Sequence, residues 1–329
     1  MTFKPTATTI AAGALMLAAS GASAQDAIRI GTSSVGSIFY TLAIGAGEII
    51  HKHAGINATI EPVGGSTASV NALGAKKIEF AMANSFASSS AFYGKYRFKK
   101  KIAIRLLVNG QPNYRSLFVR KSANIKTGQN LVGKIIIGKR RALPENELVM
   151  RAMMKVLGLG DDSVRLVATT NSPQMYKALS AGSVDGAIVP YSPRAAAITK
   201  SLQDDVVEPF YLPKDKRDEA MKYVPSAFYA QTFKPGSLTK QTKPMHVFGL
   251  STYLITRPDV SDELAYRVTK AILENTKEFA TYSRAARLWN TKRTVTDPKL
   301  PFHPGAIKFF KEKGVWTAKL EATQKRLLQ

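Results

Sequence analysis

The sequence predicts an α/β protein with two lobes, in which the chain of one lobe is interrupted by the whole of the other. Short apolar strands alternate with amphipathic helices, and small polar residues follow the strands. The alternation restarts between two extended stretches, near residues 111–118 and 245–250, and an inserted domain leaves two such crossings. We therefore expect lobe I at residues 25–113 and 246–329 and lobe II at residues 114–245. Two domains also suit a chain of 329 residues at about 150 residues per domain.

Residues 1–24 are predicted to be a signal peptide rather than part of the fold. Lys4 is the only charged residue before position 26, and residues 10–19 form an apolar run that is too short for the roughly 20 residues of a membrane span. Ala22-Ser23-Ala24 then fits the small-x-small cleavage rule, so that Gln25 begins the mature chain. Such a leader predicts export, and we expect the mature protein in the bacterial periplasm.

Lobe I begins with three strand-like segments. Residues 27–31, 57–63 and 78–83 are the predicted strands, and residues 38–51 have the apolar spacing of a helix. The loop at residues 32–37 between the first strand and this helix is rich in hydroxyl groups. Strand, loop and helix therefore alternate in the way that is typical of a parallel α/β sheet.

Small polar residues lie at the carboxyl end of each of these strands, and the ligand crevice of a parallel sheet lies outside those ends. Ser66 or Thr67 is expected to be the N-cap of a second helix. The first loop alone is typical of a tight turn, because it lacks the third glycine and the Lys-Ser/Thr pair of a phosphate loop. The repetition of polar loops predicts a binding cleft. Its residues from these loops are Thr32, Ser33, Ser34, Ser66, Asn84 and Ser85.

Lobe II repeats the alternation of strands and helices. Its predicted strands are residues 116–120, 135–138, 163–168 and 187–189. Its predicted helices are residues 145–157 and 175–181. Beyond this lobe, residues 247–256 are predicted to be one long β segment, and residues 261–285 a helix with Ser261 as its N-cap.

The composition favours anionic partners and excludes several kinds of site. The chain has 47 Lys and Arg against 23 Asp and Glu, and this net charge of +24 attracts nucleic acid, acidic membranes or small anions. The absence of cysteine excludes disulfides, thiol nucleophiles and thiolate metal sites. The four histidines form no H-E-x-x-H pair, so we expect neither a metal nor a cofactor.

An enzyme needs a nucleophile with a base, or paired carboxylates, and the sequence offers neither pattern. Acidic residues are scarce, none lies in the polar loops, and the serines form no G-x-S-x-G elbow. We therefore expect no catalytic step. The alternative is a secreted serine-type hydrolase whose triad is assembled only by folding.

Two basic segments and one histidine each have competing interpretations. Residues 95–105 interleave basic residues with Tyr96 and Phe98, which is typical of nucleic-acid binding, but export favours a solvated surface loop. No nucleic-acid partner is therefore expected.

The segment Lys139-Arg140-Arg141 follows a predicted strand, where an arginine can hold a carboxylate through two hydrogen bonds. The alternative is that all three side chains are exposed to solvent. His303, beside a helix start, is expected to be buried and hydrogen-bonded rather than a ligand.

Four segments resemble, in the right order, the TAXI branch of solute-binding proteins, which are the extracytoplasmic receptors of tripartite ATP-independent periplasmic (TRAP) transporters. They are residues 31–40 (GTSSVGSIFY), 63–66 (VGGS), 81–85 (AMANS) and 303–314 (HPGAIKFFKEKG). The resemblance implies a two-lobed periplasmic-binding-protein fold, type II-like, with a ligand cleft between the lobes. It also implies a small ligand, commonly an amino or oxo carboxylate, which the receptor hands to a permease driven by an ion gradient.

The chain departs from the family pattern on the ligand side of both lobes. The first family loop resembles GTGGTGGVYY; six of its positions differ here, while Tyr40 matches the second tyrosine. Phe86 stands where the family usually has an aspartate. Residues 138–144 (GKRRALP) replace a GAPGSGT-like loop. The identity of the family ligand therefore does not carry over, and the basic loop predicts a more anionic ligand such as a di- or tricarboxylate.

The sequence thus predicts a periplasmic receptor that captures a small anionic carboxylate by hinge closure and delivers it to the subunits of a TRAP permease. A secreted binding module that feeds a sensor or another transporter class is the alternative. In lobe II, Arg140 or Arg141, Tyr191 and Arg194 are expected to complete the cage. The predicted ligand-binding residues are Thr32, Ser33, Ser34, Tyr40, Ser66, Asn84, Ser85, Arg140, Arg141, Tyr191 and Arg194.

Overall fold

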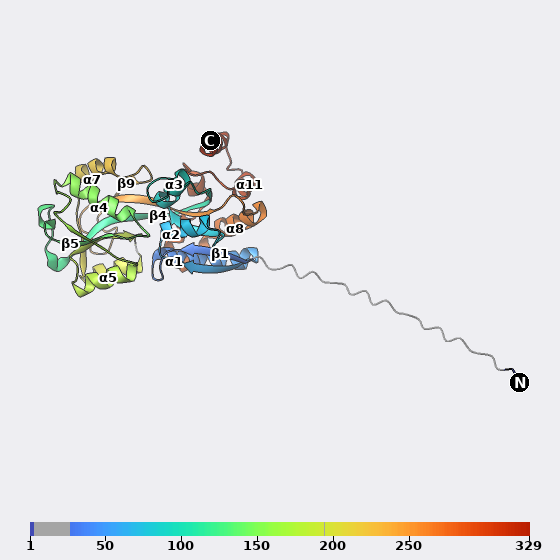
Figure 1. Ribbon diagram of the computed structural model, residues 1–329, viewed down its shortest axis with the longest axis horizontal. Helices are drawn as coiled ribbons and strands as arrows, with labels where there is room; N and C mark the ends of the chain where they lie inside the picture. Colours follow the sequence, from blue (N-terminus) through green and yellow to red (C-terminus); the bar gives the residue numbers. More distant parts are fainter. Residues whose placement is uncertain (3–26, 194) are drawn as a thin grey trace.

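Two lobes lie side by side in the computed structural model, and strands run from one into the other (Figure 1). The structure describes residues 1–2, 27–193 and 195–329. The predicted signal peptide beyond its first two residues, and the predicted site residue Arg194, lie outside the described residues. Among the described residues, no helix combines the length and the apolar character that crossing a bilayer requires.

The first part of the chain alternates strand and helix as the sequence predicts. Ser37 caps the first helix, because its Oγ accepts a hydrogen bond from the backbone N–H of Tyr40. Gly55 ends that helix in the left-handed conformation that favours glycine, with φ of +64°. The elements are β1 (Ala27–Thr32), α1 (Ile38–Ala54), β2 (Asn57–Pro62), α2 (Ser66–Gly74), β3 (Phe80–Asn84) and α3 (Ser85–Tyr93).

The expected N-cap of α2 is wrong. Gly65 occupies the capping position, and Ser66 is already helical. The Ser66 Oγ instead accepts a hydrogen bond from the backbone N–H of Asn84 at 3.0 Å. A side chain at position 65 has no room, since a Cβ there would lie 2.8 Å from the Cβ of Ala142 in lobe II. The close approach of the other lobe therefore selects glycine at this position.

The middle of the chain contains the predicted strands and helices of lobe II, with shifted ends. It also contains β8, β9, α6 and α7, which the sequence pattern did not indicate. The elements are β4 (Arg105–Arg120), β5 (Ile135–Lys139), α4 (Glu145–Val156), β6 (Arg165–Ala168), α5 (Ser172–Ala181), β7 (Gly186–Tyr191), α6 (Ala196–Gln203), β8 (Val207–Pro209), α7 (Lys214–Ala220), β9 (Tyr229–Phe233) and β10 (Met245–Thr256). Short 3-10 turns lie at Lys121–Ala123, Gln129–Leu131 and Met221–Tyr223.

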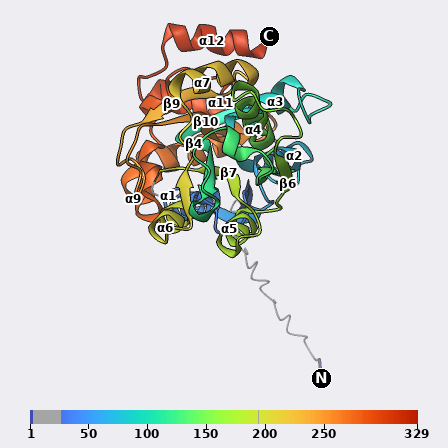
Figure 2. The ribbon, with the colours of Figure 1, turned by 90° about the vertical axis from the view of Figure 1, so that its left-hand side faces the viewer.

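The long helix expected at residues 261–285 is interrupted. Ser261 is its N-cap as predicted, but α8 ends at Glu274. The side-chain amide of Asn275 donates to the carbonyl oxygen of Ala271 at 2.8 Å, so a side chain competes with the backbone where the helix would continue. The remaining elements are α8 (Asp262–Glu274), α9 (Thr276–Tyr282), η4 (Arg284–Leu288), α10 (Thr291–Val295), α11 (Pro304–Glu312) and α12 (Ala318–Leu328). In Figure 2, α12 lies at the outer edge of the molecule.

The strands of the described residues form a ten-stranded sheet that passes through both lobes. Its order is β2-β1-β3-β10-β4-β7-β5-β6, with β8 beside β4 and β9 beside β10. The pairs that β1 forms with β2 and β3 are parallel, and so are the pairs that β5 forms with β6 and β7. The strands β4 and β10 are antiparallel to each other and stand between these two parallel groups.

The strands β4 and β10 are the two crossings. They pair along their length, from Thr256 with Arg105 to Phe248 with Arg115, and their register shifts between Ser251 and Tyr253. The predicted lobe boundaries at residues 113 and 246 fall within these two strands.

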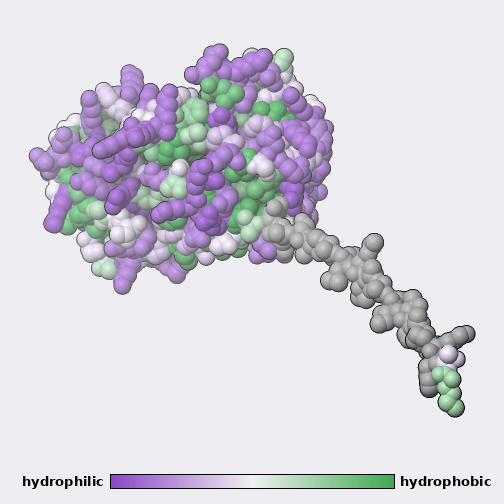
Figure 3. Space-filling view, turned by 45° about the vertical axis from the view of Figure 1, so that its right-hand side comes forward, coloured by the Kyte–Doolittle hydropathy of each residue, from purple (hydrophilic) through white to green (hydrophobic). Residues whose placement is uncertain are grey.

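The hydrophobic core is divided in the same way as the sheet. One cluster draws only on residues up to Val108 and from Tyr253 onward. The other two draw on Phe86 and on residues between Tyr114 and Leu250. Hydrophilic side chains cover most of the face shown in Figure 3, with smaller hydrophobic patches scattered among them. The predicted α/β architecture with two lobes is confirmed.

Candidate functional site

A cavity of about 550 Å³ lies between the two lobes. Lobe I contributes the loop after β1, the start of α1, Ser66 and the segment at residues 282–288. Lobe II contributes Arg140 and Leu143 from the loop after β5, part of α5, and the segment that follows β7. The crossing strand β4 contributes residues 111–115. Both lobes and one of their connections therefore form the walls.

Arg140 is bonded to both lobes. Its Nη1 donates to the Oγ of Ser172 in lobe II at 3.1 Å. Its Nη2 donates to the carbonyl oxygen of Gly64 at 2.6 Å and to the Oγ of Ser34 at 3.2 Å, both in lobe I. Its Nε is buried without a hydrogen-bond partner. A single guanidinium thus contacts both lobes, and its Nε–H is still an unused donor.

The electrostatics around Arg140 are those of a buried cation. Burial lowers the pKa of Arg140 to about 10; the nearby Glu145 opposes this shift and Arg115 adds to it. The guanidinium therefore remains charged at neutral pH. No aspartate or glutamate is among the described residues that line the cavity.

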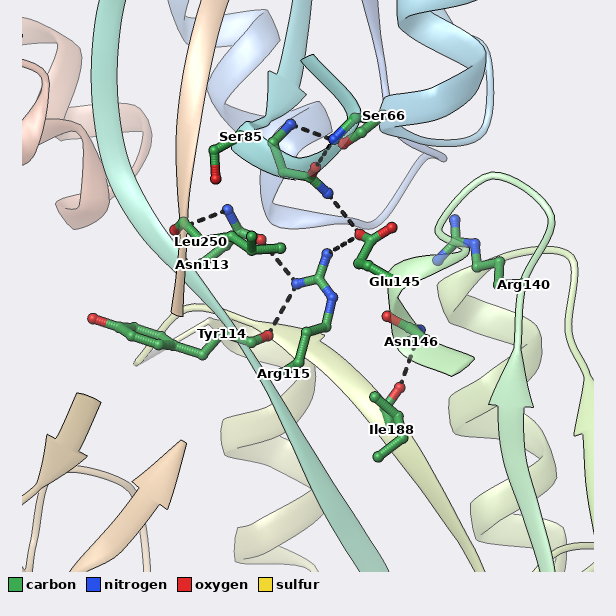
Figure 4. Close-up of polar contacts among 12 residues, drawn as sticks. Ser66, Ser85, Asn113, Tyr114, Arg115, Arg140, Glu145, Asn146, Ile188 and Leu250 are labelled. Carbon is green, nitrogen blue, oxygen red and sulfur yellow. Dashed lines mark hydrogen bonds and ion pairs between the residues drawn. The ribbon is translucent and has the colours of Figure 1, made fainter. Parts of the chain in front are cut away.

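A second buried arginine, Arg115, also lines the cavity and belongs to a hydrogen-bonded network (Figure 4). Arg115 of β4 donates from Nη2 to Glu145 Oε1 at 2.6 Å, and from Nη1 to Asn113 Oδ1 at 2.8 Å. The same Glu145 oxygen accepts from the Nδ2 of Asn84, at the end of β3, at 2.6 Å. Arg115 and Glu145 are 2% and 0% exposed, so the pair is shielded from solvent. The carboxylate at the start of α4 thus joins lobe I to the crossing strand.

The predicted site residues fall into three groups. Four line the cavity: Ser33, Ser66, Arg140 and Tyr191. The hydroxyl of Tyr191 lies 3.2 Å from the Oγ of Ser116, and burial raises the pKa of this tyrosine, so the phenol is neutral. Two more, Ser34 and Asn84, do not line the cavity but contact Arg140 and Glu145.

Of the third group, the described residues Thr32, Tyr40 and Arg141 do not line the cavity. The Thr32 side chain is fully buried, and its hydroxyl has no partner. Tyr40 is half-buried on α1 and does not line the cavity. Arg141 is exposed and also does not line it, in contrast to its neighbour Arg140. Arg194 lies outside the described residues.

Ser85 faces a different groove. Its Oγ donates to the carbonyl oxygen of Ala227 and accepts from the backbone N–H of Ser251, each at 3.1 Å. It lines a groove of about 1280 Å³, which lies between α3, the segment at residues 225–229 and the loop before α11. The polar residues after β3 therefore point to two sides of the molecule.

Several cavity residues escaped the sequence analysis. Arg115 lies in the extended stretch expected near residues 111–118, one position before the predicted strand 116–120. Ser172 begins α5. Arg284 and Arg287 lie in the turn η4, the first at the end of the helix predicted at residues 261–285 and the second just beyond it. Their positions depend on chain folding that no local pattern reports. By contrast, His303 is buried and caps α11 through its Nδ1, which accepts from the N–H of Gly305, as the sequence predicts.

The fold agrees with that of known binding proteins. MatC from Rhodopseudomonas palustris, solved with bound malate, is similar with a TM-score of 0.57 and 11% identity, over 90% of this chain and 98% of MatC. A protein from Bordetella bronchiseptica is similar with a TM-score of 0.50 and 13% identity, over 91% of this chain and 92% of that one. Such low identities show the fold alone, and it is the fold of the periplasmic solute-binding proteins.

A family model matches most of the chain. The match is to the NMT1-like family, and it runs from residue 30 to residue 314. It therefore includes both lobes, the two crossing strands and every described residue that lines the cavity. The chain belongs to the NMT1-like family.

Proposed function

We propose that this chain is a periplasmic solute-binding receptor that captures a small anionic carboxylate between its lobes. The observation that carries the proposal is the interlobe cavity, where Arg115 and Arg140 line the wall and none of the described lining residues is acidic. Guanidinium groups bind carboxylates through paired, charge-assisted hydrogen bonds. The malate bound to MatC, which shares the fold, supports a ligand of this class.

Capture requires closure of the lobes and no chemical step. Arg140 of lobe II already contacts Gly64 and Ser34 of lobe I. A ligand that contacts both lobes favours the closed state, because it binds that state more tightly than the open one. The chain is then a binding protein rather than an enzyme.

The partner that we propose is a TRAP-type permease. The TAXI-like segments at residues 31–40 and 303–314 support this choice, as does the leader that the sequence predicts. The test is uptake of labelled ligand into proteoliposomes that contain the permease encoded beside this receptor. Uptake that needs both the receptor and an ion gradient supports TRAP delivery. Uptake driven by ATP instead, or none at all, would assign the receptor to another transporter class or to a sensor.

Export has its own test. N-terminal sequencing of the protein from the periplasmic fraction should begin at Gln25. A chain that keeps Met1 and remains in the cytosol would contradict the proposed location.

The ligand class is tested by releasing whatever copurifies. Mass spectrometry of the supernatant after denaturation should identify a carboxylate, and the same compound should then raise the melting temperature of ligand-free protein. At 100 times its dissociation constant a ligand stabilises by about 2.7 kcal/mol. A cationic or neutral ligand that stabilises the protein, with no shift from any carboxylate, would refute the proposal.

A further inference from the structure

The arginines that line the interlobe cavity form two pairs with different exposure. Arg115 and Arg140 are 2% and 3% exposed and belong to β4 and to the loop after β5. Arg284 and Arg287 are exposed and belong to the turn η4 of lobe I. The cavity thus has a buried pair of cations and a second pair at its solvent-exposed rim.

The two pairs also differ in how their charge is balanced. Glu145 forms an ion pair with Arg115, so one net positive charge, that of Arg140, remains at the buried end. Neither Arg284 nor Arg287 forms an ion pair with another described residue. Each end can therefore accept an anionic group without first breaking an ion pair of the protein.

Apolar side chains make up much of the remaining wall. Phe39, Leu143 and Tyr191 are buried, and Tyr282 and Leu288 line the cavity although they are 40% and 42% exposed. Large apolar side chains at a rim are left in contact with water unless a partner covers them. Aromatic faces of this kind stack well on rings and on extended hydrocarbon chains.

The size of the cavity favours a ligand larger than a four-carbon acid. Pockets of about 300–1,000 Å³ enclose drug-sized ligands. At about 550 Å³ this cavity lies within that range, and a four-carbon acid would leave most of its apolar wall uncovered.

We propose that the ligand is a dicarboxylate whose two carboxylates are separated by an apolar ring or chain. One carboxylate binds at Arg140, the apolar body lies against the aromatic wall, and the second carboxylate lies at Arg284 and Arg287. This inference rests on the proposed function, because it specifies the class of anion that the same cavity captures.

Calorimetry on the mature protein, freed of copurified ligand by reversible unfolding, tests the proposal. The probes are terephthalate and suberate, which have an apolar spacer, and succinate and malate, which do not. Benzoate has the ring of terephthalate and octanoate has the eight-carbon chain of suberate, but each has only one carboxylate. We expect terephthalate or suberate to bind at least about tenfold more tightly than malate and succinate.

The rim is tested with the double variant Arg284→Gln and Arg287→Gln, which changes only exposed side chains. We expect it to weaken binding of the longer diacids about five- to tenfold and to leave binding of benzoate and octanoate within about twofold. The matched control is Arg97→Gln with Lys100→Gln, which removes the same charge from an exposed segment outside the cavity. The control should leave all affinities unchanged, because a distant charge acts only through the screened field.

Each contrary outcome has a separate meaning. If malate or succinate binds as tightly as the longer diacids, the apolar spacer is refuted and the receptor function stands. If the rim variant binds terephthalate and suberate as the wild type does, the second carboxylate site is refuted. If no carboxylate of any length binds, the proposed function itself fails.

Discussion

The Nη2 of Arg140 lies 2.6 Å from the carbonyl oxygen of Gly64, so a charged side chain of lobe II is bonded directly to the backbone of lobe I. A second contact between these loops joins the backbone N–H of Thr67 to the carbonyl oxygen of Ala142 at 3.2 Å. The protein therefore closes the two lobes upon each other with its own polar groups. A ligand that binds at Arg140 shares this guanidinium with the contacts that hold the lobes together.

Replacing Arg140 should weaken both ligand binding and closure. We expect Arg140→Ala to reduce carboxylate affinity about 10- to 100-fold, since charge-assisted hydrogen bonds contribute about 1.5–3 kcal/mol each. The ligand-free variant should also have a larger radius of gyration in small-angle scattering. Arg141→Ala, at the exposed neighbouring position, is the control and should match the wild type. Equal affinities for both variants would remove Arg140 from the site.

The buried pair of Arg115 and Glu145 should contribute strongly to stability. Glu145→Gln leaves the guanidinium of Arg115 buried without a counter-charge, and breaking such a pair costs about 3–5 kcal/mol. Glu147→Gln, on the same helix, breaks only a partly exposed pair with Arg151 and should cost less than about 1 kcal/mol. Urea unfolding measures both. A similar decrease in the free energy of unfolding for the two variants would show that the buried pair contributes no more to stability than the exposed one.

A side chain at position 65 should keep the lobes apart. In Gly65→Ala the new Cβ would lie 2.8 Å from the Cβ of Ala142, a contact that disappears when the lobes separate. We expect a more open ligand-free state in small-angle scattering and an affinity lowered about tenfold or more. Gly64→Ala is the control, because a Cβ there meets nothing within 4 Å, although its φ of +100° adds backbone strain. If the two variants have the same scattering profile, the contact does not govern closure.

The stability of lobe I should fall on mild acidification through His303. Burial lowers the pKa of His303 below its usual value, and the nearby Asp262 opposes this shift. The unfolded chain therefore takes up a proton near pH 6.5 while the folded one does not, so stability is lost as the pH falls through that value.

The comparison variant is His303→Asn, which keeps an N-cap side chain but has no proton to gain. Urea unfolding at pH 7.5 and pH 5.5 should show a larger loss for the wild type than for this variant. Equal losses in the two proteins would mean that His303 does not contribute to the acid sensitivity.

Local pattern was enough to predict most of the fold. The β1 strand, the polar loop and α1 follow one another as predicted, because period and capping residues act within a few positions of the chain. The short strands β8 (VEP) and β9 (YAQTF) gave no such signal, since they contain no apolar run like those of β3 (FAMAN) and β5 (IIIGK). The break at Asn275 depends on a side chain that competes with the helix backbone, and apolar spacing does not report it.

The site could be predicted only in part. The sequence placed the basic loop at the end of β5, but the inward turn of Arg140 depends on Gly64, which is 76 residues away in the chain. Arg115 lies in the extended stretch expected near residues 111–118 and was given no role, because its counter-charge Glu145 comes 30 residues later and belongs to a helix. Hydrophobic periodicity predicts which face of a helix or strand is buried, but it does not predict which other element packs against that face.

The register shift in β10 has a consequence for how the protein moves. The crossing strands β4 and β10 are hydrogen-bonded to each other, so they bend as one ribbon and not as two independent tethers. A ribbon bends most easily where its ladder is irregular, and this ladder shifts between Ser251 and Tyr253 and again between Leu254 and Ile255. The first shift lies beside Pro112, which has no N–H to donate. We therefore expect the hinge of lobe closure at the shift between Ser251 and Tyr253, where a small change in strand twist produces a large relative rotation of the two lobes.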